Sequence, residues 1–171
     1  ADIIMSKVPN VQWAAVCLSL FAGIISAFVD NVATVLMVAG MDLPETVKAV
    51  IADCPYDAPA NIIKKVLGQD MGMPVKLVYP LIRFGGMVYG RFDLNQDSPV
   101  EAVKRAKVPI LLLHGDDDRF VPYEMSCNIH AAAPDTIEFH TIKGAGHAYN
   151  YATDPETYTE IVHAFTEKVI V

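Results

Sequence analysis

The stretch from Val108 to Pro122, VPILLLHGDDDRFVP, constrains the fold more than any other part of the chain. It opens with an unbroken apolar run, Val108 to Leu113, which is typical of a fully buried parallel strand. Three consecutive aspartates follow this run after His114 and Gly115. Carboxylates at the end of a buried strand are costly unless they have partners, and ligands of open α/β sheets bind at that edge. The stretch therefore predicts an α/β domain with a polar site at the carboxyl end of its sheet.

A second strand-like run, Ile137 to Ile142, ends in the loop Lys143-Gly-Ala-Gly-His147. An acid after one strand and a histidine after the next is the order of the Asp and the His in an α/β-hydrolase triad. Parallel strands end at one edge of a sheet, so the two loops are expected to meet. The order predicts that one of the three aspartates after the first of these strands lies within hydrogen-bonding distance of His147.

The remaining elements alternate between strand and helix along the chain. A short strand is expected over residues 47–52, and helices over 98–106, over 122–132 and from 154 onward. The last helix has an apolar face at helical spacing, made by Tyr158, Ile161, Val162, Phe165 and Val169. This alternation predicts βαβ units with a parallel sheet.

Residues 57–97 separate the first two predicted strands and read as a small, cap-like helical region. Pro59, Pro74, Pro80 and the pair Gly85-Gly86 are expected to break any long element within it. The domain organisation that we predict is therefore an N-terminal segment, residues 1–31, followed by a domain over residues 32–171 that contains this region.

The N-terminal segment is dominated by apolar residues. No charged residue occurs from Val8 to Val29, and residues 11–29 are almost wholly apolar, which approaches the roughly 20 residues that span a bilayer. Two interpretations stay open: a membrane helix with Trp13 near the interface, and a buried helix of a water-soluble domain.

The cysteines have no paired spacing, which favours a reducing compartment. We therefore expect a cytoplasmic protein, with membrane association through residues 11–29 as the alternative.

A polar motif interrupts this apolar segment. Ser26, Ala27, Phe28, Asp30, Asn31 and Thr34 match the pattern Ser-Ala-Phe-x-Asp-Asn-x-x-Thr. On this pattern the stretch Ser19 to Ala39 resembles the sodium–proton antiporter, arsenite and citrate permease superfamily. The resemblance implies, as an alternative function, a fragment of a membrane ion or anion transporter.

Three motifs carry a second resemblance: DCPY after the first strand, HGDDDRFVP after the second and GAGHAYNY after the third. With them, Ala33 to Val171 resembles the C-terminal half of an α/β-hydrolase of the bacterial esterase-like kind. The resemblance implies a partial three-layer fold with a short parallel sheet, to which the sequence adds an apolar N-terminal helix. It also implies hydrolysis of a carboxylic ester, with Asp118 as the catalytic acid and His147 as the base.

The nucleophile that this resemblance requires is missing from its expected place. In the family the helix that begins Ala-Thr-Val-Leu-Met follows a Gly-x-Ser-x-Gly turn. Aligning that helix on Ala33 puts Val29 at the serine, with Ala27 and Asn31 at the two glycines. Ser26 lies three residues too early and Asp30 one residue late. We therefore expect weak activity or none, and a composite of permease-like and hydrolase-like segments.

Charge and motif content limit the partners. The net charge of −7 disfavours nucleic acid. The sequence has no paired-cysteine metal motif, phosphate-binding glycine loop or dinucleotide fingerprint, so we expect neither a metal nor a cofactor. The expected partner is a small ester. A non-catalytic domain that oligomerises to cover an exposed sheet edge is the remaining alternative.

Overall fold

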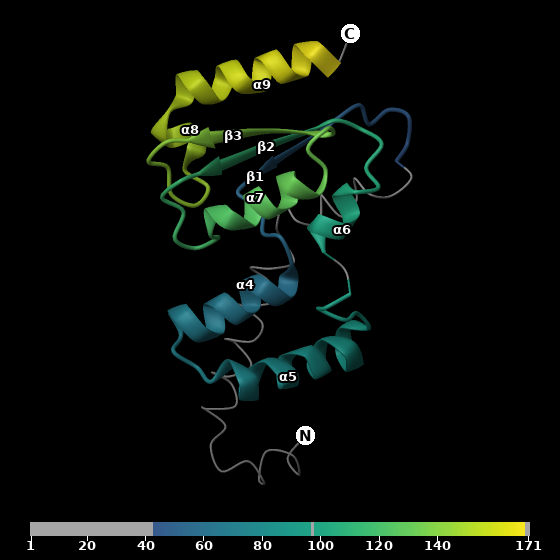
Figure 1. Cartoon of the computed structure of the whole chain (residues 1–171), viewed down its shortest axis with the longest axis vertical. Helices are drawn as coiled ribbons and strands as arrows, with labels where there is room; N and C mark the ends of the chain where they lie inside the picture. Colours follow the sequence, from purple (N-terminus) through teal and green to yellow (C-terminus); the bar gives the residue numbers. More distant parts are fainter. Residues whose placement is uncertain (1–42, 97, 170–171) are drawn as a thin grey trace, which may run out of the picture. The chain divides into compact units, whose positions relative to one another are not determined.

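The computed structural model describes residues 43–96 and 98–169 (Figure 1). Its centre is a parallel sheet with the strand order β1-β2-β3, formed by β1 (Val50–Asp53), β2 (Ile110–Gly115) and β3 (Ile137–Ile142). Ile110 of β2 lies opposite Val50 on one side and Ile137 on the other. The predicted α/β class with a short parallel sheet is confirmed.

In the part of the chain that the structure describes, helices connect these strands and follow the last of them. They are α4 (Pro59–Lys65), α5 (Val75–Gly85), α6 (Pro99–Val103), α7 (Tyr123–Ala132), α8 (Asn150–Thr153) and α9 (Pro155–Val169), with π-helical turns η1 (Val66–Asp70) and η2 (Gly86–Gly90). At the start of α6, the Ser98 hydroxyl accepts a hydrogen bond from the Glu101 N–H, which is the expected N-terminal cap.

The expectation that prolines and glycines break the cap-like region was wrong for α5, which runs through Pro80. A proline inside a helix removes one backbone hydrogen bond and strains the preceding turn. The ring of Pro80 is exposed, whereas the adjacent Tyr79 is buried and its hydroxyl is hydrogen-bonded to Asn95. The contacts of Tyr79 therefore hold α5 across the proline, whereas Leu77, Leu81 and Phe84 of the same helix are exposed.

Alternate residues of β2 face opposite layers of helices, because successive side chains of a strand point to opposite sides. Ile110 and Leu112 pack with residues of α6 and α7, whereas Leu111 and Leu113 pack with Phe165 of α9. Figure 1 shows α9 on one side of the sheet and α6 and α7 on the other. The predicted apolar face of the last helix is the one that packs here: Phe165 is buried, with Tyr158, Ile161, Val162 and Val169 against the same cluster.

The α9 layer leaves the edge strand partly open. β1 pairs only with β2 in the part of the chain that the structure describes, and Ile51 on it is 38% exposed. The alternative in which a second copy of the chain covers this edge stays a prediction.

The expectations for the N-terminal segment lie outside the described residues. They concern the apolar helix over residues 11–29, the permease-like motif over 19–39 and the boundary between residues 31 and 32. Within residues 43–96 and 98–169, none of the helices has the length and apolar character needed to cross a bilayer.

Candidate active site

The three consecutive aspartates after β2 have three different environments. The carboxylate of Asp116 accepts a hydrogen bond from the backbone N–H of Gly144 at 2.5 Å. Asp117 is exposed and pairs with Arg119 at 3.3 Å. The side chain of Asp118 has no exposed surface. Asp116 therefore connects the two loops, Asp117 faces solvent, and Asp118 alone points into the protein.

The loops after β2 and β3 are held together by their backbones. The N–H of Asp117 donates to the carbonyl of Ala145 at 3.1 Å, and the N–H of Asp116 donates to Ile142 at 3.4 Å. Gly115 makes this approach possible, since a Cβ at that position would lie 2.1 Å from the Ala145 carbonyl oxygen. The close approach of the two loops explains why the acid and the histidine meet.

The predicted acid and base are hydrogen-bonded. Nδ1 of His147 lies 2.7 Å from Oδ2 of Asp118, and Oδ1 of Asp118 accepts the N–H groups of Phe120 and Val121 at 2.9 Å each. Since a carboxylate oxygen accepts, Nδ1 carries the hydrogen and Nε2 of His147 is left with its lone pair. The side chain of His147 is 27% exposed, so a substrate can reach it.

The hydrogen bonds around Asp118 keep it ionised although it is buried. Burial alone raises the pKa of a carboxyl group, but contacts with His114 and His147 and the N–H of Val121 lower it. The result is a pKa well below the ordinary value of 3.8. Asp118 is therefore a carboxylate at neutral pH and can stabilise a protonated His147.

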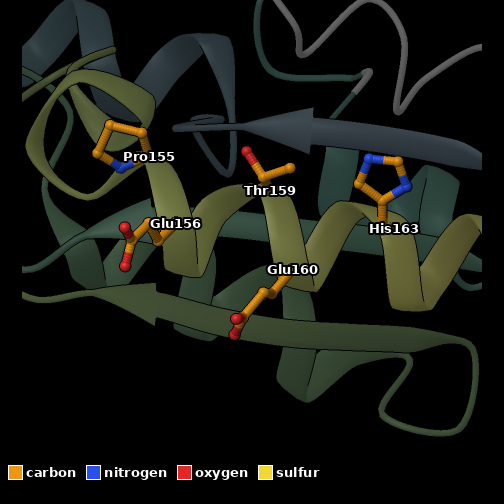
Figure 2. Close-up of a pocket in the computed structure, with 5 residues that line it drawn as sticks. All are labelled: Pro155, Glu156, Thr159, Glu160 and His163. Carbon is orange, nitrogen blue, oxygen red and sulfur yellow. The ribbon is translucent and has the colours of Figure 1, made fainter.

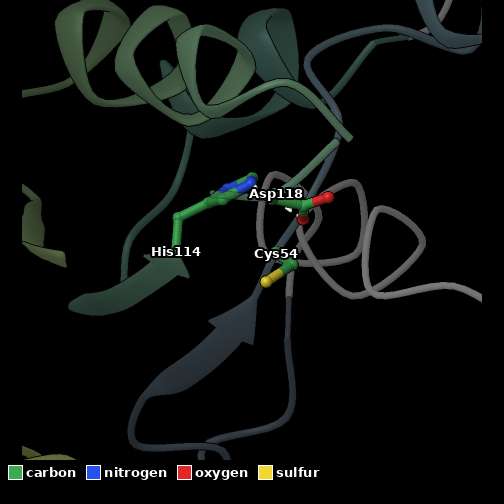
Figure 3. A group of neighbouring side chains, drawn as sticks. All are labelled: Cys54, His114 and Asp118. Carbon is green, nitrogen blue, oxygen red and sulfur yellow. Dashed lines mark ion pairs between the residues drawn. The ribbon is translucent and has the colours of Figure 1, made fainter. Parts of the chain in front are cut away.

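Asp118 belongs to a cluster of three buried side chains, together with Cys54 and His114 (Figure 3). Ligand atoms of Cys54, His114 and Asp118 lie within 4.8 Å of one another, a spacing that could suit a metal ion. However, Nδ1 of His114 is 2.6 Å from the Ser126 hydroxyl, and its Nε2 is 3.0 Å from the Val121 carbonyl. Both ring nitrogens already have protein partners, so this cluster does not offer the ligand geometry of a metal site.

Cys54 is not arranged as a nucleophile, even though it follows β1 with a positive φ of 51°. Burial raises the pKa of its thiol to about 12, an effect that the Ala148 N–H opposes and the Asp53 carboxylate reinforces. The Cys54 sulfur contacts the Asn150 amide at 3.3 Å. A buried, protonated thiol is a poor nucleophile.

We expect iodoacetamide to label Cys127 much faster than Cys54 in the folded chain. Cys127 is only half-buried, whereas Cys54 is 4% exposed and its thiol has a raised pKa. Mass spectrometry of digested protein gives the labelling rate at each site, and unfolding in denaturant should make the two rates similar. Equal rates in the folded chain would contradict the buried position of Cys54.

The aromatic ring of Phe120 lies beside the imidazole of His147. The Phe120 ring centroid is 5.0 Å from that of His147, and the Lys65 ammonium lies 5.7 Å from the Phe120 centroid. Lys65 is itself held by Asp70 at 2.8 Å and by the Arg119 carbonyl at 2.7 Å. The end of α4 thus contacts the acid loop and fixes an apolar surface next to the base.

A hollow of about 500 Å³ lies elsewhere, along the outer face of α9 (Figure 2). Pro155, Glu156, Thr159, Glu160 and His163 line it, and all five are exposed. The hollow includes neither Asp118 nor His147, so it is not part of the acid–base site.

Sequence reasoning named the acid and the base but missed the residues that support them. Phe120 lies inside the HGDDDRFVP motif, and Asn150, whose amide donates to Asp53 at 2.5 Å, lies inside GAGHAYNY. The position of Phe120 and Asn150 inside these motifs is the sequence signal that could have identified them. Nothing in the local sequence points to Lys65 or Ser126.

The possible nucleophiles weighed from the sequence cannot be placed at this site. Val29, Ser26 and Asp30 all lie outside the described residues. Within the described ranges, no hydroxyl or thiol is hydrogen-bonded to Nε2 of His147.

Comparisons with known proteins identify the fold and the family of the chain. The chain is 21% identical over 136 residues to the uncharacterized protein YqkD of Bacillus subtilis (strain 168), a match that covers 80% of this chain and 45% of that protein. The esterase domain of a Rhodothermus marinus protein superposes with a TM-score of 0.55 at 23% identity, over 80% of this chain and 56% of that one.

The Pyrococcus furiosus esterase Pf2001 also has the same fold, with a TM-score of 0.55 at 18% identity over 80% of this chain and 49% of that chain. The chain thus spans about half the length of these relatives. Residues 84–169, which include both site loops and half of the chain, match the model of one family. The chain therefore belongs to the dienelactone hydrolase family.

Proposed function

We propose that this chain carries the acid and the base of a carboxylic-ester hydrolase that works by acyl transfer to a side-chain nucleophile. The observation that carries the proposal is the hydrogen bond of 2.7 Å between His147 Nδ1 and Asp118 Oδ2, on loops that follow neighbouring strands. Nε2 of His147, on a side chain that is 27% exposed, is the atom that would take the proton from the nucleophile. The same imidazole would later give this proton to the leaving alcohol.

The exposed ring of Phe120 next to His147 favours an ester substrate with an apolar group. A substrate carbonyl near Nε2 of His147 would bring its acyl or alcohol part against Phe120, which is 39% exposed. Apolar contact there releases water from both surfaces and helps to position the ester. The whole enzyme's substrate would thus be a small, partly apolar ester.

Our proposal includes a low activity for this chain by itself. The position that aligns with the nucleophilic serine holds Val29, which has no group to attack a carbonyl. Ala27 and Asn31 replace the two glycines of the elbow, so the tight turn is also unsupported. The Asp118–His147 pair would then serve only as a slow general base for water.

We expect the purified chain to hydrolyse a short-chain activated ester slowly, with a rate that rises linearly with substrate and does not saturate. His147→Ala should reduce this rate to the buffer background, because the imidazole is the catalytic group. His163→Ala removes an exposed histidine of α9 outside the acid and base loops and serves as the matched control. Initial rates measured by absorbance decide between these outcomes.

Two results would contradict the proposal. Equal rates for the unchanged chain and His147→Ala would remove the base from the reaction. A fast, saturable rate that both His147→Ala and Ser26→Ala abolish would identify Ser26 as the nucleophile, and the alignment on Val29 would be wrong.

A further inference from the structure

His114 is a completely buried imidazole at the end of β2, and its surroundings define its protonation. Nε2 lies 3.0 Å from the Val121 carbonyl oxygen, which can only accept, so Nε2 carries a hydrogen. Nδ1 lies 2.6 Å from the Ser126 hydroxyl of α7, which can donate to it. In the Nε2–H form of His114, the ring, the Val121 carbonyl and the Ser126 hydroxyl all have hydrogen-bond partners.

The same Nε2–H group also faces the acid. It lies 3.2 Å from Oδ2 of Asp118, the oxygen that His147 contacts at 2.7 Å. Oδ2 of Asp118 thus accepts from His147 and lies close to the Nε2–H of His114, which is hydrogen-bonded to the Val121 carbonyl. Oδ1 accepts two backbone N–H groups. The dashed line in Figure 3 marks the contact between His114 and Asp118.

His114 also connects both ends of the acid loop. Its Nε2 contacts the carboxylate at the start of the loop and the Val121 carbonyl at its end, while the Val121 N–H returns to Asp118. The ring is packed edge-on to Tyr123, at 5.8 Å between centroids, and close to Cys54. A fully buried ring thus contacts both the Asp118 carboxylate and the Val121 carbonyl.

We propose that His114 is a positioning residue, which together with Ser126 holds the Asp118 carboxylate so that its Oδ2 keeps His147 in the Nδ1–H form. The inference rests on the proposed function, since the Nδ1–H form is the one that leaves Nε2 free to act as a base. Ser126 contributes by donating to Nδ1 of His114 and so favouring the tautomer with hydrogen on Nε2.

The test is the tautomer of His147, read from long-range ¹H–¹⁵N NMR spectra of histidine-labelled protein. We expect a single Nδ1–H form for His147 and a single Nε2–H form for His114. His114→Phe keeps the ring shape but loses both nitrogens, and should lower the ratio of the Nδ1–H to the Nε2–H form of His147 at least about tenfold. His114→Gln, whose amide can restore the N–H near Nε2, should recover most of that ratio.

Matched variants separate this role from a loss of folding. His163→Phe changes an exposed histidine of α9 and should leave the His147 spectrum as it was. If His114→Phe does not fold, Ser126→Ala decides, because it keeps the His114 ring and removes only the donor to Nδ1. Nε2 of His114 keeps its hydrogen for the Val121 carbonyl, but the ring loses the hydrogen bond that orients it, which should lower the Nδ1–H fraction of His147.

The outcomes distinguish this inference from the proposed function. The role of His114 is overturned if the tautomer of His147 is unchanged in folded His114→Phe. If that variant does not fold, an unchanged tautomer in Ser126→Ala overturns it instead. Either result leaves the acid–base pair intact. A His147 that lacks the Nδ1–H form already in the unchanged chain overturns the pair itself, and the proposed function with it. The readout needs no catalytic turnover, so low activity does not affect it.

Discussion

Gly115→Ala is expected to destabilise the domain by about 3 kcal/mol, the upper end of the usual cost of overpacking. The added Cβ would lie 2.1 Å from the Ala145 carbonyl oxygen and 2.6 Å from its carbonyl carbon. These are backbone atoms next to His147, and they cannot rotate away as a side chain could. The loop after β3 must move, which breaks the hydrogen bond from Asp117 to Ala145.

Gly146→Ala is the matched control for this prediction, because it adds the same methyl group to the same loop. A Cβ at Gly146 meets no atom within 4 Å, and we expect a change within about 0.5 kcal/mol. Urea unfolding followed by circular dichroism measures both variants. Equal midpoints for Gly115→Ala and Gly146→Ala would show that the two loops do not approach as closely as described.

The sheet and its helices could be predicted because their signals are local. The apolar run before His114 is a fully buried parallel strand. The run from Ile137 to Ile142 is a parallel strand with the bounds that the pattern predicted, and only its two end residues are buried. The apolar face of α9 was also predicted correctly, since one helical period places Phe165 and its neighbours on one side. Burial on both faces of a parallel strand leaves an apolar run that one sequence is enough to reveal.

The support of the site depends on contacts between distant segments, and a single sequence does not carry that information. Lys65 reaches Arg119 across 54 positions, and Ser126 meets His114 only because α7 folds back over β2. The run of three aspartates was ambiguous by itself, and only the family pattern selected Asp118. The helix through Pro80 was missed because the contact of Tyr79 with the distant Asn95 outweighed a local preference.

The second large effect is expected for Asp118→Asn, which should lower the free energy of unfolding by about 3 kcal/mol near neutral pH. Asparagine keeps the size of the side chain and one carbonyl oxygen for the N–H groups of Phe120 and Val121. Its amide nitrogen would then face the N–H groups of His147 and His114, where Oδ2 now lies. Opposed donors in a buried site leave several groups without partners.

The pH dependence of this effect follows from the depressed pKa of Asp118. A carboxyl group whose pKa is lower in the folded than in the unfolded chain stabilises the fold above the unfolded value, here 3.8. That stabilisation is lost as the pH falls below 3.8 toward the depressed folded value. The difference in unfolding free energy between the unchanged chain and Asp118→Asn should therefore be large at about pH 5 and clearly smaller at about pH 3.

Asp117→Asn provides the comparison within the same loop. The Asp117 side chain is 59% exposed and pairs only loosely with Arg119, so its replacement should change stability by no more than about 0.5 kcal/mol at either pH. Denaturant titrations of the three proteins at both pH values give the two differences. If Asp118→Asn cost no more than Asp117→Asn at about pH 5, the carboxylate would not hold the two histidines, and the acid loop would owe its position to backbone contacts alone.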